Sequence, residues 1–443
     1  MSSYVGSGTL QNILQADGLS QDTINQIINS LTSLGDFDNG KKVNLHVGGP
    51  PFDDAQVVID NTPSPITVDT SSDPSLQWLI DLDANVTVTG SNNIGVAVGD
   101  QTNTVNLSGS SGNDTVLAGD GANTITGGSG VDSMVAGDGA HDLIIAGSGA
   151  HQFLQVGDGN FDTLVGGSGA RDTLIAGDGR HDLLLAGDGA HQSLQAGDGN
   201  FDTLFGGDGA KDTLTAGDGR HDLLIAGGGA DQLLHAGDGN FDTLFGGSGA
   251  KDTLIAGDGN HDWLIAGGGA DQSLMAGDGN FDTLLGGSGA KDTLAAGNGD
   301  HDLLKAGSGS HQSLQAGDGN FDTLIGGSGA WDTLTAGNGN HDLLRAGSGS
   351  HQLLQGGSGD DTLIAGSGGG DTLDGGGGND LFKVGSVGND TVAGGGGTDT
   401  LEFTNYSQSD ETSSVTNGGV TTLTFNDGQE VSYSGITTIK FDH

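Results

Sequence analysis

Apolar residues recur every ten positions through the middle of the chain. From Ala136 to Gln355 the sequence is a run of 22 decapeptides with the pattern (A/G)-G-x-G-x-x-(D/Q)-x-L-x. Each decapeptide carries one aliphatic residue, nearly always Leu, after a short turn that is bracketed by two Gly. A fixed repeat sustained over this length predicts a solenoid, in which each repeat buries its apolar residue against its neighbours.

A second period of 40 residues lies on top of the first. It is visible at the residue before Asp or Gln, which runs Phe161, Arg171, His181, His191, Phe201, Lys211, His221, Asp231. This period permits one, two or four decapeptides per solenoid turn, and a single decapeptide cannot enclose a core. We favour two, which predicts an all-β solenoid: a parallel β-roll of about 20-residue turns with a short strand on each face. A small mixed α/β cap is expected at its N-terminal end.

The repeats that flank this array are nine residues long. They are Gly109–Leu117, Ala118–Thr126, Gly127–Val135, Gly356–Ile364, Gly375–Lys383 and Gly394–Glu402. Four of the hexapeptides here, GGSGVD (127–132), GGSGDD (356–361), GGGGND (375–380) and GGGGTD (394–399), resemble the RTX calcium-binding nonapeptide G-G-x-G-x-D-x-U-x. The resemblance extends over residues 109–402 and implies a β-roll that binds several Ca²⁺ ions between successive turns, through turn carbonyls and Asp side chains.

The resemblance also implies which residues bind the metal. The Asp ligands are Asp114, Asp132, Asp142, Asp162, Asp182, Asp202, Asp222, Asp242, Asp262, Asp282, Asp302, Asp322, Asp342, Asp361, Asp380 and Asp399. The carbonyl ligands are Gly128, Gly130, Gly357, Gly359, Gly376, Gly378, Gly395 and Gly397. The decapeptides depart from the family pattern, because one extra residue precedes each Asp, as Phe161 precedes Asp162.

Turns of 20 residues would stack alternate decapeptides on opposite edges of the roll. Edge A then carries a column of Asp from Asp142 to Asp399 and a second, mostly Asp column in its turns. Carboxylates about 4.8 Å apart repel one another, and hard cations with oxygen ligands would neutralise them. Edge B alternates Asp with Gln as far as Gln352 and carries Arg171, Lys211, Lys251 and Lys291. We therefore expect edge B to bind fewer metal ions than edge A, or none.

The two faces of the roll should also differ, because the residues that flank each inward Leu point outward. After edge B they are mostly polar. After edge A they form an apolar stripe that includes Leu185, Phe205, Ile225, Phe245, Trp263, Ile265 and Leu285. Such a stripe is expected to be a self-association or adhesion surface. Alternatively, the inserted residue reorients the strand, or the stripe packs under the N-terminal region.

Ten of the 13 His occupy the position before Asp or Gln. On edge A they alternate with Phe, so successive His would lie roughly 9–10 Å apart, too far to share one zinc or copper ion. A structural ladder of His and Phe is the expected arrangement.

Composition narrows the classes of function. The chain has 443 residues and a formal net charge of −46, which argues against nucleic acid as a partner. No apolar run approaches the roughly 20 residues of a transmembrane helix. Without Cys there are no disulfides. We found no catalytic motif and expect no enzymatic activity.

The two ends differ from the array. We divide the chain into residues 1–108 (an N-terminal helix and β-rich cap or assembly region), 109–402 (the β-roll) and 403–443 (a C-terminal cap and secretion-signal region). A helix is predicted from Ser20 to about Leu34, and β-structure over 43–47, 55–60 and 65–69. The first residues lack a Sec-type signal, whereas the RTX resemblance implies type I secretion through an uncleaved C-terminal signal. The expected location is therefore secreted, extracellular or at the cell surface.

The function expected from these features is a calcium-binding, non-enzymatic structural protein of the cell surface. Surface-layer, biofilm-matrix or filament proteins that self-associate are the candidates, with a cell-surface glycan or protein as a further partner. The alternatives are a ligand-binding adhesin, including an ice-binding one, and a monomeric calcium-binding module.

Overall fold

The computed structural model describes residues 2–16, 19, 21–33, 36, 42–47, 55–60, 64–81, 85–385 and 388–441. They form two compact units, Met1–Gly217 and Asp218–His443. This division falls inside the decapeptide array, and the boundaries expected near residues 108 and 402 stay predictions. Each unit is a parallel β-solenoid with turns of about 20 residues, which confirms the predicted fold class.

Each unit has two sheets in which the solenoid strands pair in parallel, and every turn contributes one short strand to each; at the N-terminal end Ser2–Val5 pairs antiparallel with Val43–Val47. The odd-strand sheet of the first unit contains β1 (Ser2–Val5), β2 (Val43–Val47), β3 (Val57–Asp60), β5 (Trp78–Asp81), β7 (Gly95–Val98), β9 (Thr115–Leu117), β11 (Ser133–Val135), β13 (Phe153–Gln155), β15 (Thr173–Ile175), β17 (Ser193–Gln195) and β19 (Thr213–Thr215). The even-strand sheet contains β4 (Ile66–Asp69), β6 (Val86–Gly90), β8 (Thr104–Ser110), β10 (Thr124–Thr126), β12 (Leu143–Ile145), β14 (Thr163–Val165), β16 (Leu183–Leu185) and β18 (Thr203–Phe205).

The second unit repeats this arrangement. Its odd-strand sheet contains β21 (Leu233–His235), β23 (Thr253–Ile255), β25 (Ser273–Met275), β27 (Thr293–Ala295), β29 (Ser313–Gln315), β31 (Thr333–Thr335), β33 (Leu353–Gly357), β35 (Thr372–Gly376) and β37 (Asp390–Ala393), followed by β39 (Glu411–Asn417), β40 (Val420–Phe425) and β41 (Glu430–Ser434). Its even-strand sheet contains β20 (Leu223–Ile225), β22 (Thr243–Phe245), β24 (Trp263–Ile265), β26 (Thr283–Leu285), β28 (Leu303–Lys305), β30 (Thr323–Ile325), β32 (Leu343–Arg345), β34 (Thr362–Ile364), β36 (Leu381–Val384), β38 (Thr400–Phe403) and β42 (Thr438–Phe441).

The register of the strands builds the core. Leu164 pairs with Leu184 on the next turn, and the central Leu of each array strand is fully or almost fully buried. The two residues that flank each central Leu point outward and are half-buried or exposed. Because successive side chains of a strand point to opposite faces, one aliphatic residue per decapeptide is enough to fill the interior.

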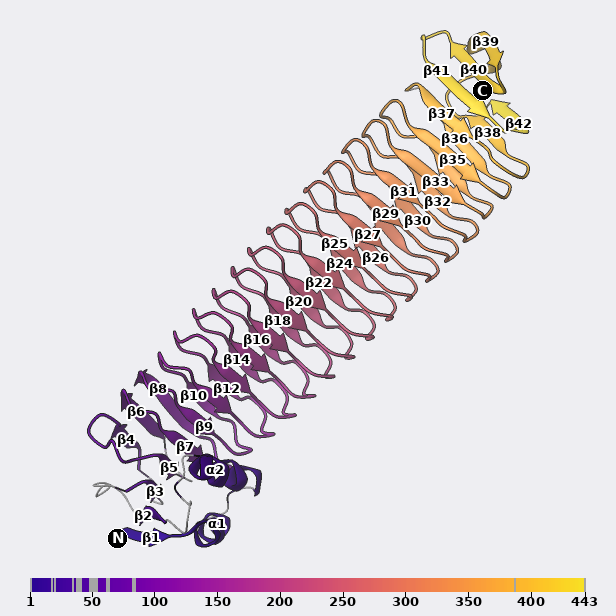
Figure 1. Cartoon of the computed structure of the whole chain (residues 1–443). Helices are drawn as coiled ribbons and strands as arrows, with labels where there is room; N and C mark the ends of the chain where they lie inside the picture. The colour runs from indigo at the N-terminus through magenta and orange to yellow at the C-terminus, as the bar shows by residue number, and fades with distance from the viewer. Residues whose placement is uncertain are drawn as a thin grey trace. The chain divides into compact units, whose positions relative to one another are not determined.

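The N-terminal cap contains helices α1 (Ser7–Ala16) and α2 (Gln21–Ser33), which lie beside the first strands (Figure 1). Helix α2 confirms the predicted helix, whereas α1 was not predicted. Ile24, Ile27 and Leu31 are buried in one cluster with Trp78 and Ile80 of the odd-strand sheet. No residue of the apolar stripe belongs to that cluster, so the helices cover the other sheet. Neither of these described helices has the length and apolarity needed to cross a bilayer.

The inserted residue of each decapeptide adopts a left-handed backbone conformation. All 22 of these residues, from His141 to His351, have φ between 59° and 67°, although none is Gly. Their N–H groups donate to carbonyl oxygens on the following turn, as Phe161 N does to Arg180 O at 2.9 Å. A left-handed residue with a side chain costs about 1–2 kcal/mol, so these hydrogen bonds offset a real strain.

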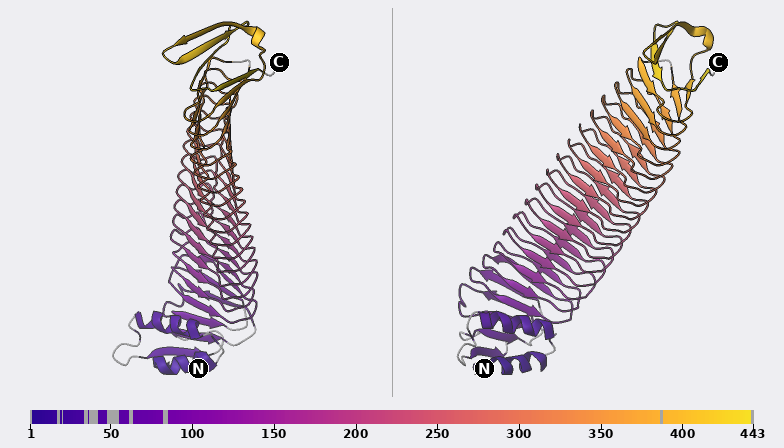
Figure 2. Two further views of the ribbon diagram at one scale, coloured as in Figure 1. Left: turned by 90° about the vertical axis from the view of Figure 1, so that its right-hand side faces the viewer. Right: turned by 45° about the vertical axis from the view of Figure 1, so that its right-hand side comes forward.

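The C-terminal end of the second unit changes from parallel to antiparallel pairing. Strands β41 and β42 still add in parallel to β37 and β38, whereas β39, β40 and β41 form an antiparallel meander (Figure 2). The buried Phe425 of β40 packs against the buried Phe403 with ring centroids 5.2 Å apart, and the Tyr406 ring stacks on Phe425 with a centroid separation of 3.9 Å. The meander thereby covers the last turn of the apolar core.

Candidate metal centre

Edge A carries a column of buried carboxylates, one per turn, directly before each even-numbered strand. The column runs from Asp142 to Asp202 in the first unit and from Asp222 to Asp399 in the second, and none of these residues is more than 2% exposed. Along the column, Oδ1 accepts the backbone N–H of the column residue one turn earlier, which is Asn123 for Asp142 and an Asp further on, for example from Asp242 N to Asp262 Oδ1 at 2.8 Å. The ladder therefore uses only one oxygen of each carboxylate.

The second oxygen of the column is buried without a hydrogen-bond partner among the described residues. This holds for Oδ2 of Asp142, Asp162, Asp182, Asp242, Asp262, Asp282, Asp302, Asp322, Asp342, Asp361, Asp380 and Asp399. On edge B it also holds for Asp114, Asp212 and Asp390. A buried acceptor without a donor is costly, and more so for an ionised one. A row of such atoms indicates that edge A requires either protons or cations.

The pKa values of the column residues also indicate that these carboxylates require protons or cations. The pKa of Asp262 and Asp302 is raised from 3.8 to about 8; burial is the largest cause, and neighbouring Asp carboxylates of the column contribute to the rise. Hydrogen bonds from the backbone act in the opposite direction. The pKa rises to about 7 for Asp162, Asp242, Asp282, Asp322 and Asp361, and to about 6 for Asp142, Asp182, Asp342 and Asp380. The metal-free column is therefore partly protonated near neutral pH.

Turn carbonyls face the side chains of this column. In the first turns the column residue is Asn, and Asn123 Nδ2 donates to the carbonyl oxygens of Gly119 and Gly121 at 2.8 and 2.6 Å. Asn103 Nδ2 makes the same pair of contacts with Gly99 and Gln101, both at 2.7 Å. A carboxylate cannot donate, so an Asp at this position leaves carbonyl and carboxylate oxygens facing one another. Oxygen-only donor sets of this kind suit Ca²⁺.

The C-terminal nonapeptides present the same set. Gly357 and Gly359 precede Asp361 at the spacing of the RTX motif, as Gly376 and Gly378 precede Asp380 and Gly395 and Gly397 precede Asp399. The turns stack so closely that a Cβ on Gly378, whose φ is +113°, would collide with the carbonyl oxygen of Gly359. Glycine is thus required for these carbonyls to approach a shared ion.

No three His, Cys, Asp or Glu side chains gather into a metal-binding group anywhere in the described residues. Calcium on edge A would therefore be held by main-chain carbonyls together with the unpartnered Oδ2 atoms. When bound, the ion would supply the positive charge that allows the buried column to stay ionised.

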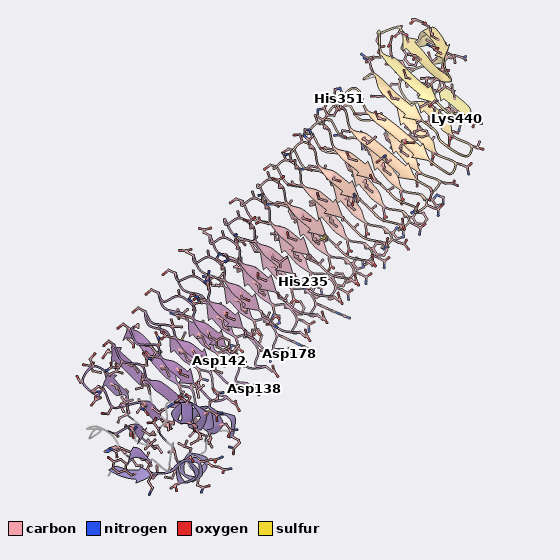
Figure 3. The ribbon with its side chains drawn as sticks, viewed as in Figure 1. Asp138, Asp142, Asp178, His235, His351 and Lys440 are labelled. Carbon is pink, nitrogen blue, oxygen red and sulfur yellow. The ribbon has the colours of Figure 1, made fainter. Side chains whose placement is uncertain are left out.

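The turns of edge A carry the expected second column of carboxylates. In Figure 3, Asp138, Asp142 and Asp178 lie along one side of the first unit. Asp138 and Asp178 are exposed, unlike the buried Asp142. Each turn residue donates its N–H to the preceding carboxylate, as Asp178 N does to Asp158 Oδ1 at 3.0 Å. Water can hydrate these exposed carboxylates, so they need no ion of their own.

Edge B is built differently. Asp132 Oδ1 accepts from Asp114 N and its Oδ2 from Gly128 N, at 3.0 and 2.7 Å. The carbonyls of Gly128 and Gly130, predicted as calcium ligands, both lie within hydrogen-bond range of Gln152 Nε2, at 3.4 and 3.3 Å. An amide nitrogen therefore stands where the resemblance implies a cation.

Among the described residues, no ion pair joins Lys211, Lys251 or Lys291 to the Asp column of edge B. The structure shows one ion pair within the described ranges, Lys383 Nζ to Glu402 Oε1 at 3.8 Å, on outward positions of β36 and β38. Glutamine amides, rather than lysines, pair with the carboxylates of edge B.

The family model of the RTX calcium-binding nonapeptide repeat matches residues 108–140, 346–382 and 366–401, which leaves most of the decapeptide array outside the match. No curated protein matches the chain. The repeat match and the parallel solenoid fit an RTX β-roll protein. RTX repeats imply Ca²⁺ binding and suggest a secreted, calcium-binding structural protein, because proteins with these repeats are generally secreted.

The His and Phe residues of edge A form the predicted structural ladder. Phe241 stacks between His221 and His261 with ring centroids 5.0 and 4.8 Å apart. On edge B, Trp331 stacks on His351 at 4.4 Å. These are the left-handed inserted residues, so stacking helps to hold a strained backbone.

Substitution of Phe241 separates stacking from strain. Phe241→Ala keeps the left-handed residue but removes two stacked contacts, and should lower the free energy of unfolding by about 1–3 kcal/mol. Phe241→Gly removes the same contacts but relieves the backbone strain, so its loss should be smaller. Urea unfolding in saturating calcium measures both. An alanine variant at least as stable as the glycine variant would contradict the assigned strain.

The predicted assembly residues occupy one outward column of the even-strand sheet. Leu185 and Phe205 lie in register in the first unit, and Phe245, Ile265 and Leu285 in the second. Ile225 pairs with Phe245. These side chains are half-buried against their column neighbours, whereas Trp263, in the adjacent outward column, is 53% exposed. The strands are not reoriented by the inserted residue.

Proposed function

We propose that this protein is a secreted, calcium-dependent structural protein of the cell surface that self-associates and has no enzymatic role. The calcium dependence is supported by the buried Asp column of edge A, where Oδ2 atoms such as those of Asp242, Asp262 and Asp282 have no donor among the described residues. Free calcium outside cells is high enough for weak sites of this kind. The chain would fold where calcium is available, since binding energy is then folding energy.

Self-association is supported by the apolar column of the even-strand sheet. Consecutive turns repeat the same outward apolar position within each unit, from Ile145 to Phe205 in the first and from Ile225 to Leu285 in the second, where Lys305 is the first charge of the column. A second copy offers a column of the same spacing and composition. A net charge of −46 keeps copies apart. Calcium on edge A would lower this repulsion, so assembly should accompany calcium binding.

Serine substitutions in the apolar stripe test the assembly. We expect the wild type in calcium to sediment above the monomer mass, and the triple variant Phe205→Ser, Phe245→Ser, Trp263→Ser to sediment as a monomer with an unchanged circular dichroism spectrum. The matched control is Leu233→Ser with Met275→Ser, two outward positions of the odd-strand sheet that are each 37% exposed. It should keep the wild-type mass. Assembly that persists in the triple variant would exclude this stripe as the interface.

An adhesin is the second candidate, and the odd-strand sheet supports it. Thr253, Ser273, Thr293, Ser313 and Thr333 pair in register and place one outward hydroxyl on every turn. An ordered row of hydroxyls suits a glycan or an ice surface. This candidate needs no self-association, so a wild type that stays monomeric in calcium favours it, or a monomeric calcium-binding module, over the assembly proposal.

A further inference from the structure

The glutamines of edge B contact the oxygens that a cation would contact. Gln272 Nε2 lies 3.4 Å from Gly247 O, 3.1 Å from Gly249 O and 3.4 Å from Asp252 Oδ2, all on the preceding turn. Two further glutamines repeat this triad of two turn carbonyls and one carboxylate. They are Gln312, with distances of 3.3, 3.1 and 3.1 Å, and Gln352, with three distances of 3.2 Å.

The other end of each amide fixes its orientation. Gln272 Oε1 accepts the N–H of Gly267 at 2.7 Å, and the Oε1 atoms of Gln312 and Gln352 accept from Gly307 and Gly347, both at 2.6 Å. A reversed amide would set its oxygen against three oxygens and its NH₂ against an N–H. Only one orientation satisfies both ends, so the nitrogen faces the carbonyls and the carboxylate.

The two carbonyls and one carboxylate of this triad match the oxygen donors of edge A, but on edge B they already have a hydrogen-bond donor in the Gln amide. On edge A the carbonyls and the Oδ2 atoms have no amide to bind them. On edge B, Asp292 Oδ2 accepts from Gln312 Nε2 at 3.1 Å and from Gly287 N at 3.3 Å, and Asp332 Oδ2 accepts from Gln352 Nε2 and Gly327 N in the same way. We propose that the amides of Gln272, Gln312 and Gln352 close edge B in place of calcium, so that edge B takes up no calcium at these turns.

The alternation of Asp and Gln follows from this arrangement. A Gln must find a carboxylate on the preceding turn, so two Gln in succession would lack the acceptor. Two Asp in succession lack the amide, and they occur on edge B only outside the Gln-containing turns, at Asp114 with Asp132 and at Asp371 with Asp390. Oδ2 of Asp114 and of Asp390 again has no hydrogen-bond partner in the described structure, and within the Gln-containing turns the same holds for Oδ2 of Asp212.

Two substitutions of Gln272 test the proposal, with calcium counted by equilibrium dialysis and thermal midpoints measured in calcium and in chelator. Gln272→Met removes the amide at similar volume. The number of bound ions should stay at the wild-type value, while the midpoint falls by a similar amount in both conditions. Gln272→Glu places a second carboxylate in the triad. This variant should have a lower thermal midpoint than the wild type in chelator and should regain the lost midpoint in calcium. It should also bind about one calcium ion more than the wild type.

An edge A variant is the matched control. Asp262→Asn should lower the calcium count without lowering the midpoint in chelator, because it removes a buried charge.

A lower calcium count in Gln272→Met would overturn the proposal, since it would make Gln272 a calcium ligand. The proposal rests on the calcium dependence that the proposed function includes, yet the two ideas can be refuted separately. A wild type that binds no calcium refutes the calcium dependence. A metal-free Gln272→Met variant that is as stable as the metal-free wild type refutes the amide closure.

Discussion

Removal of calcium at neutral pH should abolish most of the β-structure. Edge A places a buried carboxylate on every turn, and each one left ionised without a cation opposes folding. A site with free calcium at 100 times its Kd contributes about 2.7 kcal/mol, so a few such sites equal the stability of a whole domain. Because both edges enclose one Leu core, the loss of edge A should unfold edge B as well.

Circular dichroism and hydrogen exchange on chelator-treated protein measure this effect. Calcium should restore the β-signal, and magnesium at the same concentration should not, because Mg²⁺ gives up its water reluctantly. A full β-signal with wild-type exchange protection in chelator at pH 7.5 would show that the decapeptide turns do not need the ion.

The second large effect is a reversed pH dependence of the metal-free protein. Eleven carboxylates of the column, from Asp142 to Asp380, have pKa values of about 6 to 8 in the folded state, against 3.8 as the ordinary value. A raised folded pKa favours the protonated acid. The stability it contributes is therefore fully present below about pH 4 and is lost as pH rises through 6 to 8. With calcium bound the trend should invert, because protons displace the ion as pH falls.

Chemical denaturation at pH 5 and pH 8, in chelator and in calcium, tests this inversion. One unit of pKa shift corresponds to about 1.4 kcal/mol, so even a few column residues should give an effect of several kcal/mol. A metal-free protein that is more stable at pH 8 than at pH 5 would refute the assignment.

Two triple variants separate the buried column from overall charge. The first replaces the buried residues and comprises Asp242→Asn, Asp262→Asn and Asp282→Asn. The second replaces exposed turn residues and comprises Asp238→Asn, Asp258→Asn and Asp278→Asn. Both remove the same charge, and Asn occurs naturally in each column, at Asn123 and Asn298. Only the first triple should flatten the pH dependence in chelator; an equal effect of the second would assign it to net charge.

Much of this architecture could be predicted from the spacing of residues alone. The ten-residue period and the single Leu per repeat require a stacked strand in every decapeptide, and the 40-residue period excluded three repeats per turn. The nonapeptides at both ends pointed to the metal, and the spacing of Ile24, Ile27 and Leu31 identified α2. These signals are local and recur many times, so each repeat reports the same structure. Helix α1 gave a weaker signal, because its helicity depends on packing of Leu10 and Leu14 against the cap.

Contacts between residues one turn apart could be decided only by the tertiary structure. The sequence shows that Gln272 follows Asp252 on edge B, but not that its amide nitrogen faces that carboxylate and two carbonyls. It shows an extra residue before each Asp, but not that its backbone is left-handed. Both depend on main-chain hydrogen bonds between consecutive turns, which set the direction of every carbonyl. For the same reason the Asp columns were predictable from spacing, whereas the unpartnered Oδ2 atoms of edge A, such as that of Asp262, were not.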